Sequence, residues 1–152
     1  MLFSKWVKAR RLALGYTQAQ LSEMCGLGRT NLAAIENGKR TASTDMKRSI
    51  ARCLAAPPSK LLPAYRTQIL ALAQENGISN IRVFGSIARN EDTIWSDIDL
   101  LVTLPEHNKA LHLFRFSESL QRIIPAPLDV LSDNTAVPNK VVNRALREAV
   151  VL

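Results

Sequence analysis

The chain has few cysteines and no long apolar segment. No stretch of its 152 residues approaches the roughly 20 apolar residues that cross a bilayer. The opening MLFSKWVKARR lacks the apolar core and the cleavage site of a signal peptide. Cys25 and Cys53 stand singly, without metal-type spacing, among apolar residues at helical spacing. We therefore expect reduced core thiols rather than a disulfide, in a cytoplasmic protein with no membrane segment.

Acidic residues are scarce in the first half of the chain. Residues 1–62 contain eleven lysines and arginines against three acids, a balance of +8, whereas residues 63–152 contain nine against ten, a balance of −1. The formal net charge of +7 therefore belongs to the first half. Such asymmetry indicates that one half meets a polyanion and that the other half has a different task.

The first half has the pattern of several short helices. Apolar residues at helical spacing predict a first helix that ends at Gly15. Thr17 and Gln20 match a capping box at the start of a second helix, which Gly26 ends. A third helix is expected between residues 28 and 38, and a fourth over residues 44–56, because the prolines at positions 57 and 58 would end it.

The second half alternates helices and strands. After one further turn at residues 59–62, Pro63 is expected to open a new helix over residues 64–76. Short apolar runs predict strands at residues 81–84, 98–104 and 127–131, and helical patterns cover residues 109–124 and 138–149. Strands separated by helices indicate a small α/β domain. We therefore expect a helical domain at residues 1–62 and an α/β domain at residues 63–152.

Two short helices joined by Cys25-Gly26-Leu27 fit a helix-turn-helix, whose second helix enters the major groove of DNA. Side chains at the start of that helix can read base edges, while the start of the preceding helix and the segment that follows can hold phosphates. The candidate DNA contacts are Thr17, Gln18, Arg29, Thr30, Asn31, Lys39 and Arg40. Glu36 is expected to bond within the helix bundle instead. A helical interaction module with a solvated basic face is the alternative.

This stretch resembles the Xre and phage-repressor family over about residues 3–62. The matching residues are Thr17-Gln18-Ala19-Gln20-Leu21-Ser22, then Gly26-Leu27-Gly28, Leu32, and Ile35-Glu36-Asn37-Gly38-Lys39-Arg40. The resemblance implies an all-helical bundle that binds double-stranded operator DNA. Helix-turn-helix domains usually bind paired half-sites in DNA, so a homodimer is expected. Gly28 stands where the family has a Ser or Thr cap, and Ala33-Ala34 leaves little side chain for the groove, so we expect modest sequence specificity.

Three aspartates of the second half are candidates for a metal site. Asp97 and Asp99 are two residues apart on an expected strand and so project to the same face, while Asp129 interrupts a later apolar strand. Hard cations such as Mg²⁺ prefer carboxylates and relieve the repulsion between them. Asp129 is the candidate general base or third ligand, and Asp133, in a Ser-Asp-Asn turn, is its rival.

The turn at Gly85-Ser86 is the candidate phosphate site. It follows an expected apolar strand and opens a helix, whose N-terminus favours anions. Gly85 would let phosphate approach the backbone, and Ser86 would donate its hydroxyl. Arg89 would either neutralise phosphate or lie at the surface of the fold.

These residues together resemble the minimal nucleotidyltransferases of the DNA polymerase β superfamily over about residues 64–152. Phe84-Gly85-Ser86-Ile87-Ala88-Arg89-Asn90 and Ser96-Asp97-Ile98-Asp99-Leu100-Leu101-Val102 match the family's Gly-Ser pair and the Asp-x-Asp that follows about ten residues later. The resemblance implies a mixed sheet, an NTP substrate such as ATP, and Mg²⁺ as cofactor. Asn90 stands where the family commonly has glycine, which Asn replaces because it tolerates the left-handed conformation. The alternative is a degenerate fold that keeps the motif for packing or partner binding.

A unit of about 90 residues has no room for a second domain that grips an acceptor, so we expect a docking macromolecule. The resemblance implies antitoxins paired with HEPN-type ribonuclease toxins, some of which receive AMP from ATP. The leading hypothesis is a DNA-binding antitoxin and transcriptional autoregulator that nucleotidylates, or otherwise neutralises, a partner toxin of HEPN or kinase-like type. The alternatives are a transcriptional regulator with a non-catalytic nucleotide-sensing or partner-binding domain, and a nucleotidyltransferase toxin.

Overall fold

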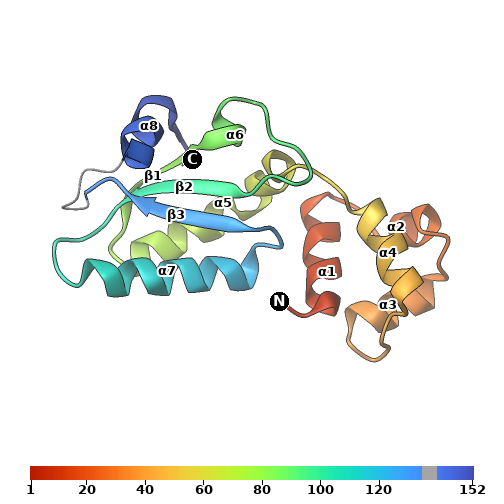
Figure 1. Ribbon diagram of the computed structural model, residues 1–152. Coiled ribbons are helices and arrows are strands. Elements are labelled where there is room, and N and C mark those ends of the chain that lie inside the picture. The colour runs from red at the N-terminus through yellow and green to blue at the C-terminus, as the bar shows by residue number, and fades with distance from the viewer. Residues whose placement is uncertain (135–139) are drawn as a thin grey trace. The chain divides into compact units, whose positions relative to one another are not determined.

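The computed structural model describes residues 1–134 and 140–152, which divide into a helical unit, Met1–Ala56, and a mixed unit, Pro57–Leu152 (Figure 1). Within these residues, none of the helices combines the length and apolar character that crossing a bilayer requires. The expected domain boundary near residue 62 lies inside a helix of the second unit. The assignment of residues 1–62 and 63–152 as separate functional domains stays a prediction.

Four helices form the first unit: α1 (Phe3–Ala13), α2 (Gln18–Met24), α3 (Arg29–Glu36) and α4 (Thr44–Cys53). Their apolar faces meet in one core around Val7, Leu21, Leu32, Ile35 and Ile50. The capping box at Thr17 and Gln20 is confirmed, and Gly28 begins α3 with no side-chain cap, as expected from its missing side chain. Paired α2 and α3 with a tight turn between them give the helix-turn-helix that the sequence predicts.

The fourth helix is three residues shorter than expected. It ends at Cys53 rather than residue 56, although the proline pair begins only at position 57. The guanidinium of Arg10 donates to the carbonyl oxygens of Leu54 and Ala56 at 3.0 and 2.9 Å. Pro57 and Pro58 have no N–H to donate to the carbonyls of Cys53 and Leu54, and the residue before a proline avoids the helical conformation, so the helix ends before the proline pair. The buried arginine of α1 then satisfies the carbonyls of Leu54 and Ala56.

A buried ion pair ties three helices of the first unit together. Arg11 donates from Nε and Nη2 to the two carboxylate oxygens of Glu36 at 2.7 and 3.0 Å, and Gln18 donates to Glu36 at 2.8 Å. The side chains of Arg11 and Glu36 are only 8% and 1% exposed. Glu36 thus bonds within the bundle, as expected, and its pair orients α1, α2 and α3 relative to one another.

The second unit contains a four-stranded mixed sheet in the order β3-β2-β1-β4. Its helices are α5 (Pro58–Glu75), α6 (Gly85–Ala88), α7 (Lys109–Ile123) and α8 (Lys140–Glu148), and its strands are β1 (Ser79–Phe84), β2 (Ile98–Thr103), β3 (Leu128–Ser132) and β4 (Val150–Val151). β1 pairs antiparallel with β2 and β4, whereas β2 and β3 run parallel. Figure 1 shows α5 and α7 along one face of the sheet and α6 and α8 on the other.

Helix α5 corrects the expectation that Pro63 starts a new helix. The helix is continuous from Pro58 to Glu75 and carries Pro63 in its interior. A proline there removes one intrahelical hydrogen bond. Leu61 and Leu62 on one side of it, and Ile69 on the other, are buried, so packing of one continuous apolar face outweighs the lost bond.

The C-terminal end of the chain also differs from the sequence expectation. The last helix ends at Glu148, and Val150–Val151 form an edge strand against Arg82 and Val83 that was not predicted. Two apolar residues are too few to show a strand period. The expected start of that helix at residue 138 lies outside the described residues. Asn90 has φ +56°, which confirms the left-handed conformation expected for it.

Candidate active site and DNA-binding surface

Gly85, in the first half of the nucleotidyltransferase motif, lies directly against Asp99 in the second half. Gly85 follows β1 with φ +70°, a conformation that L side chains rarely adopt. A Cβ atom there would lie 2.2 Å from Oδ2 of Asp99. The contact arises because Phe84 pairs with Asp99 across the antiparallel β1–β2 ladder. The glycine is therefore needed where the backbone passes the carboxylate, and not only where a phosphate would approach.

Three carboxylates converge at the end of the sheet. Asp97, Asp99 and Asp129 each offer an oxygen, and these oxygens all lie within 4.8 Å of one another. Asp99 lies opposite Asp129 in the parallel β2–β3 register, while Ile98 and Leu100 are buried on the other face. Three hard oxygen donors at this separation suit a divalent cation such as Mg²⁺, which would relieve their mutual repulsion.

The electrostatics of Asp99 reflect this crowding. Desolvation first, and then the neighbouring charges of Asp97 and Asp129, raise the pKa of Asp99 from 3.8 to about 6, although Arg89 opposes the effect. A carboxylate whose ionised form is disfavoured in the apo protein gains most from a bound cation. A bound cation would therefore offset the cost of ionising Asp99.

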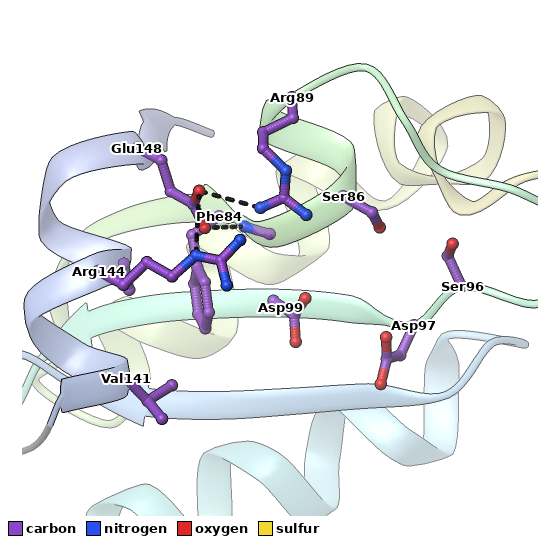
Figure 2. Close-up of a pocket in the computed structure, with 11 residues that line it drawn as sticks. Phe84, Ser86, Arg89, Ser96, Asp97, Asp99, Val141, Arg144 and Glu148 are labelled. Carbon is purple, nitrogen blue, oxygen red and sulfur yellow. Dashed lines mark hydrogen bonds and ion pairs between the residues drawn. The ribbon is translucent and has the colours of Figure 1, made fainter.

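A pocket of about 370 Å³ adjoins the carboxylates (Figure 2). Its walls come from β1 and α6, from the start of β2, and from α8. It is lined by Phe84, Gly85, Ser86, Arg89, Ser96, Asp97, Asp99, Val141, Arg144, Ala145 and Glu148. The predicted residues Gly85, Ser86 and Arg89 thus share one cavity with Asp97 and Asp99, and Asp129 lies beyond that lining on the adjacent strand.

Helix α8 supplies pocket residues that sequence reasoning missed. Val141, Arg144 and Glu148 face the cavity from the last helix (Figure 2). Arg89, predicted to meet phosphate, already donates to Glu91 at 2.8 Å and to Glu148 at 2.9 Å. The available signal was the spacing of residues 141, 144 and 148, which places them on one side of a helix. Nothing in the sequence indicates that this side meets the Gly85 turn.

Glu148 also binds the backbone of the phosphate turn. Its Oε1 accepts from the Gly85 N–H at 3.1 Å. Desolvation acts to raise the pKa of Glu148, but hydrogen bonds from Arg89 and from Gly85 outweigh it and lower the pKa below its ordinary value. Glu148 is therefore an ionised carboxylate at neutral pH, held against the turn where a triphosphate is expected.

Asp133, the rival third carboxylate, lies apart from the cluster. It forms an ion pair with Arg82 and accepts from the Thr103 hydroxyl at 2.9 Å. Both partners come from the β1–β2 ladder beyond the pocket. The parallel register therefore brings Asp129, and not Asp133, to Asp97 and Asp99.

The candidate DNA contacts lie at the starts of α2 and α3 and in the segment that follows α3. Arg29 and Thr30 are exposed in its first turn, and Lys39 and Arg40 are exposed in the segment that follows α3. Asn31 is half-buried and accepts from Arg40, so that the segment after α3 bonds back to its first turn. Thr17 is exposed at the start of α2, whereas Gln18 is half-buried and donates to Glu36. Gln18 therefore has a structural partner besides any contact with phosphate.

Comparisons with known proteins find both units. A nucleotidyltransferase domain model matches residues 66–152, and a helix-turn-helix model matches residues 7–61. A Methanocaldococcus jannaschii protein that bears the name "putative protein adenylyltransferase" is 35% identical over 85 residues, which are 56% of this chain and 90% of the relative. A second protein of that organism and name is 30% identical over 93 residues, which are 61% of this chain and 94% of the relative.

A solved structure agrees with these relatives. It is described as a "putative minimal nucleotidyltransferase", superposes with a TM-score of 0.54 at 33% identity, and covers 62% of this chain and 95% of that chain. The mixed sheet, the Gly85-Ser86 turn and the Asp97/Asp99 pair occupy the matched region. The chain therefore belongs to the nucleotidyltransferase-domain family in its minimal form, and an Xre-type helix-turn-helix domain precedes that domain in the sequence.

Proposed function

We propose that the chain is a DNA-binding antitoxin and autoregulator whose second unit transfers AMP from ATP to a partner toxin. The observation that supports the transfer most directly is the convergence of three carboxylates beside the Gly85-Ser86 turn at one pocket. The names of the two relatives favour a protein as the acceptor.

The chemistry requires one displacement at phosphorus. The acceptor's hydroxyl oxygen bonds to the α-phosphorus, the bond from that phosphorus to the bridging oxygen of the β-phosphate breaks, and pyrophosphate leaves with the electron pair. The hydroxyl proton passes to Asp129, an exposed member of the cluster that lies outside the pocket lining. Ser86 donates to a phosphate oxygen, and Arg89 and Arg144 supply positive charge at the pocket.

Asp97, Asp99 and Asp129 are the residues that would hold Mg²⁺. When bound, Mg²⁺ neutralises charge on the phosphate oxygens, which lowers the repulsion that the attacking oxygen meets. A bound cation would also explain why a cluster of carboxylates lies next to a site for an anionic substrate. Without a cation, the carboxylates would repel the triphosphate.

The transfer is tested with α-labelled ATP, Mg²⁺ and the protein encoded beside this chain's gene. Label on that protein, lost in an Asp97→Asn/Asp99→Asn variant, is the expected result. Transfer that persists in the double variant would exclude this cluster as the catalytic site. ATP-dependent DNA affinity without any transfer would favour a nucleotide-sensing regulator, and growth arrest on expression of this chain alone would favour a toxin.

The DNA-binding role is tested on the chain's own upstream DNA. Arg29→Ala should weaken specific binding by about 1–3 kcal/mol, because an arginine at the start of a recognition helix can contact a guanine edge with two hydrogen bonds. Arg122→Ala is the matched control, since Arg122 is an exposed arginine of α7 with a side chain 80% exposed. Equal binding by both variants, measured by gel shift at a stated salt concentration, would remove Arg29 from the interface.

A further inference from the structure

Glu148 is a carboxylate in an unfavourable place for a nucleotide site. It lines the pocket with Asp97 and Asp99, but it does not belong to the cluster of three aspartates. A triphosphate carries several negative charges, so a fourth carboxylate beside it costs binding energy through repulsion. No cation is needed to explain its ionisation, because protein groups already hold it. A contribution to nucleotide binding that offsets this repulsion would explain the position of Glu148.

The contacts of Glu148 connect α8 to Gly85, at the start of α6, and to Arg89, which follows the end of α6. Oε1 accepts from the Gly85 N–H at 3.1 Å, and Oε2 accepts from Nη1 of Arg89 at 2.9 Å. Arg144, one turn earlier on α8, approaches Oε2 at 3.8 Å. Figure 2 shows the Glu148 side chain reaching from α8 toward Arg89 at the edge of the pocket. The side chain is 19% exposed, so its bonds are partly shielded from water.

These contacts fix two groups that have other accessible arrangements. Gly85 has no side chain and adopts φ +70°, so its peptide has little local reason to stay in one orientation. Arg89 is a long side chain whose ordering costs conformational entropy. A carboxylate that accepts from both at once orders them before any ligand arrives, and such preorganisation lowers the cost of binding.

We propose that Glu148 is a positioning residue that holds Gly85 and Arg89 in the arrangement that binds the triphosphate. The inference rests on the proposed nucleotide site and assigns a role to α8 in it. Glu148 acts through Gly85 and Arg89 and has no part in the displacement itself. The opposing arrangement, in which Glu148 merely occupies the places of phosphate oxygens and is displaced by the ligand, predicts the opposite change in affinity when its charge is removed.

The test compares Glu148→Ala and Glu148→Gln in the full chain. The ligand is a non-hydrolysable ATP analogue with Mg²⁺, and its dissociation constant is measured by calorimetric titration. Glu148→Ala should weaken binding about tenfold or more, because the Gly85 N–H then loses its acceptor and Arg89 keeps only its bond to Glu91. Glu148→Gln keeps an oxygen for the Gly85 N–H and should recover part of that loss. Glu118→Gln, at an exposed ion pair on α7, is the matched control and should bind as the unaltered protein does.

A second measurement separates positioning from general damage to the fold. The dissociation constant of Mn²⁺ at the aspartate cluster is measured by paramagnetic resonance without nucleotide. It should change less than about threefold in Glu148→Gln, because the three carboxylates remain. The amide signal of Gly85 should shift in Glu148→Ala and stay close to its original position in Glu148→Gln.

The outcomes are distinct. Unchanged or tighter nucleotide binding in both variants, with Mn²⁺ binding retained, overturns the positioning role and leaves the proposed function intact. Loss of Mn²⁺ and nucleotide binding together in both variants also overturns it, because Glu148 is then needed for the fold of the site. Absence of nucleotide binding in the unaltered chain refutes the proposed function itself.

Discussion

Replacing Asp99 with asparagine is expected to stabilise the apo protein at neutral pH while it removes cation binding. The pKa of Asp99 is about 6 rather than 3.8, chiefly because of desolvation and then because of Asp97 and Asp129. Each pKa unit corresponds to about 1.4 kcal/mol, so the ionised carboxylate costs up to about 3 kcal/mol relative to the protonated one. Partial contact with solvent reduces this to about 1–2 kcal/mol. Asparagine has nearly the same shape without the charge.

The pH dependence has a definite sign. Because the pKa of Asp99 is raised on folding, the cost is fully present above pH 6 and disappears as the pH falls toward 3.8. At pH 5 the advantage of the asparagine variant should therefore be about half of its value at pH 7.5. Below about pH 3 the two proteins should unfold alike, since Asp99 is then mostly protonated in both the folded and the unfolded state.

Differential scanning calorimetry in EDTA measures this effect. A gain of 1–2 kcal/mol raises the Tm of a domain of this size by at least about 4 °C. Millimolar Mg²⁺ should raise the Tm of the unaltered chain and leave that of Asp99→Asn unchanged, which also identifies the transition of the second unit. Glu118→Gln serves as a control for loss of an exposed carboxylate. A lower Tm for Asp99→Asn at pH 7.5 in EDTA would refute the reasoning.

Two further predictions concern single contacts. Gly85→Ala should destabilise the second unit by about 2 kcal/mol or more, because it adds left-handed strain and a Cβ atom against the Asp99 carboxylate; in an Asp99→Ala background only the strain, about 1 kcal/mol, should remain, and equal losses in both backgrounds would contradict the contact. Glu36→Ala should cost the first unit about 3–5 kcal/mol, because it leaves the buried guanidinium of Arg11 without its carboxylate. Urea unfolding followed by the fluorescence of Trp6, in a background without the exposed Trp95, measures this loss, and a change below about 1 kcal/mol would contradict it.

Much of the fold follows from features that are local in the chain. The capping box at Thr17 and Gln20 satisfies backbone donors three residues apart, so its geometry needs no distant partner. The alternation of Asp97, Ile98 and Asp99 likewise separates a polar face from a buried one wherever the strand lies. Helix type and the two-part organisation of helical and mixed segments were therefore predictable, and the described structure agrees with them.

Where a local preference competes with packing, the sequence alone was misleading. Pro63 lacks an N–H and argues for a helix boundary, but α5 runs through it because the leucines before it and Ile69 after it are buried together. The fourth helix ends before the proline pair, and Arg10 of α1 binds the carbonyls that follow it, a contact that no local pattern predicts.

The same distinction between local sequence pattern and tertiary packing applies to the candidate active site. The sequence by itself determined the Gly85-Ser86 turn and the Asp97/Asp99 pair, because the residues of each are near neighbours in the chain. Only the tertiary structure decided which later aspartate joins them, since the parallel register sets Asp129 opposite Asp99. It alone also brought Glu148 to Gly85, 63 residues earlier in the chain. A hydrogen bond across that separation depends on how α8 packs against the sheet, and no local pattern contains that information.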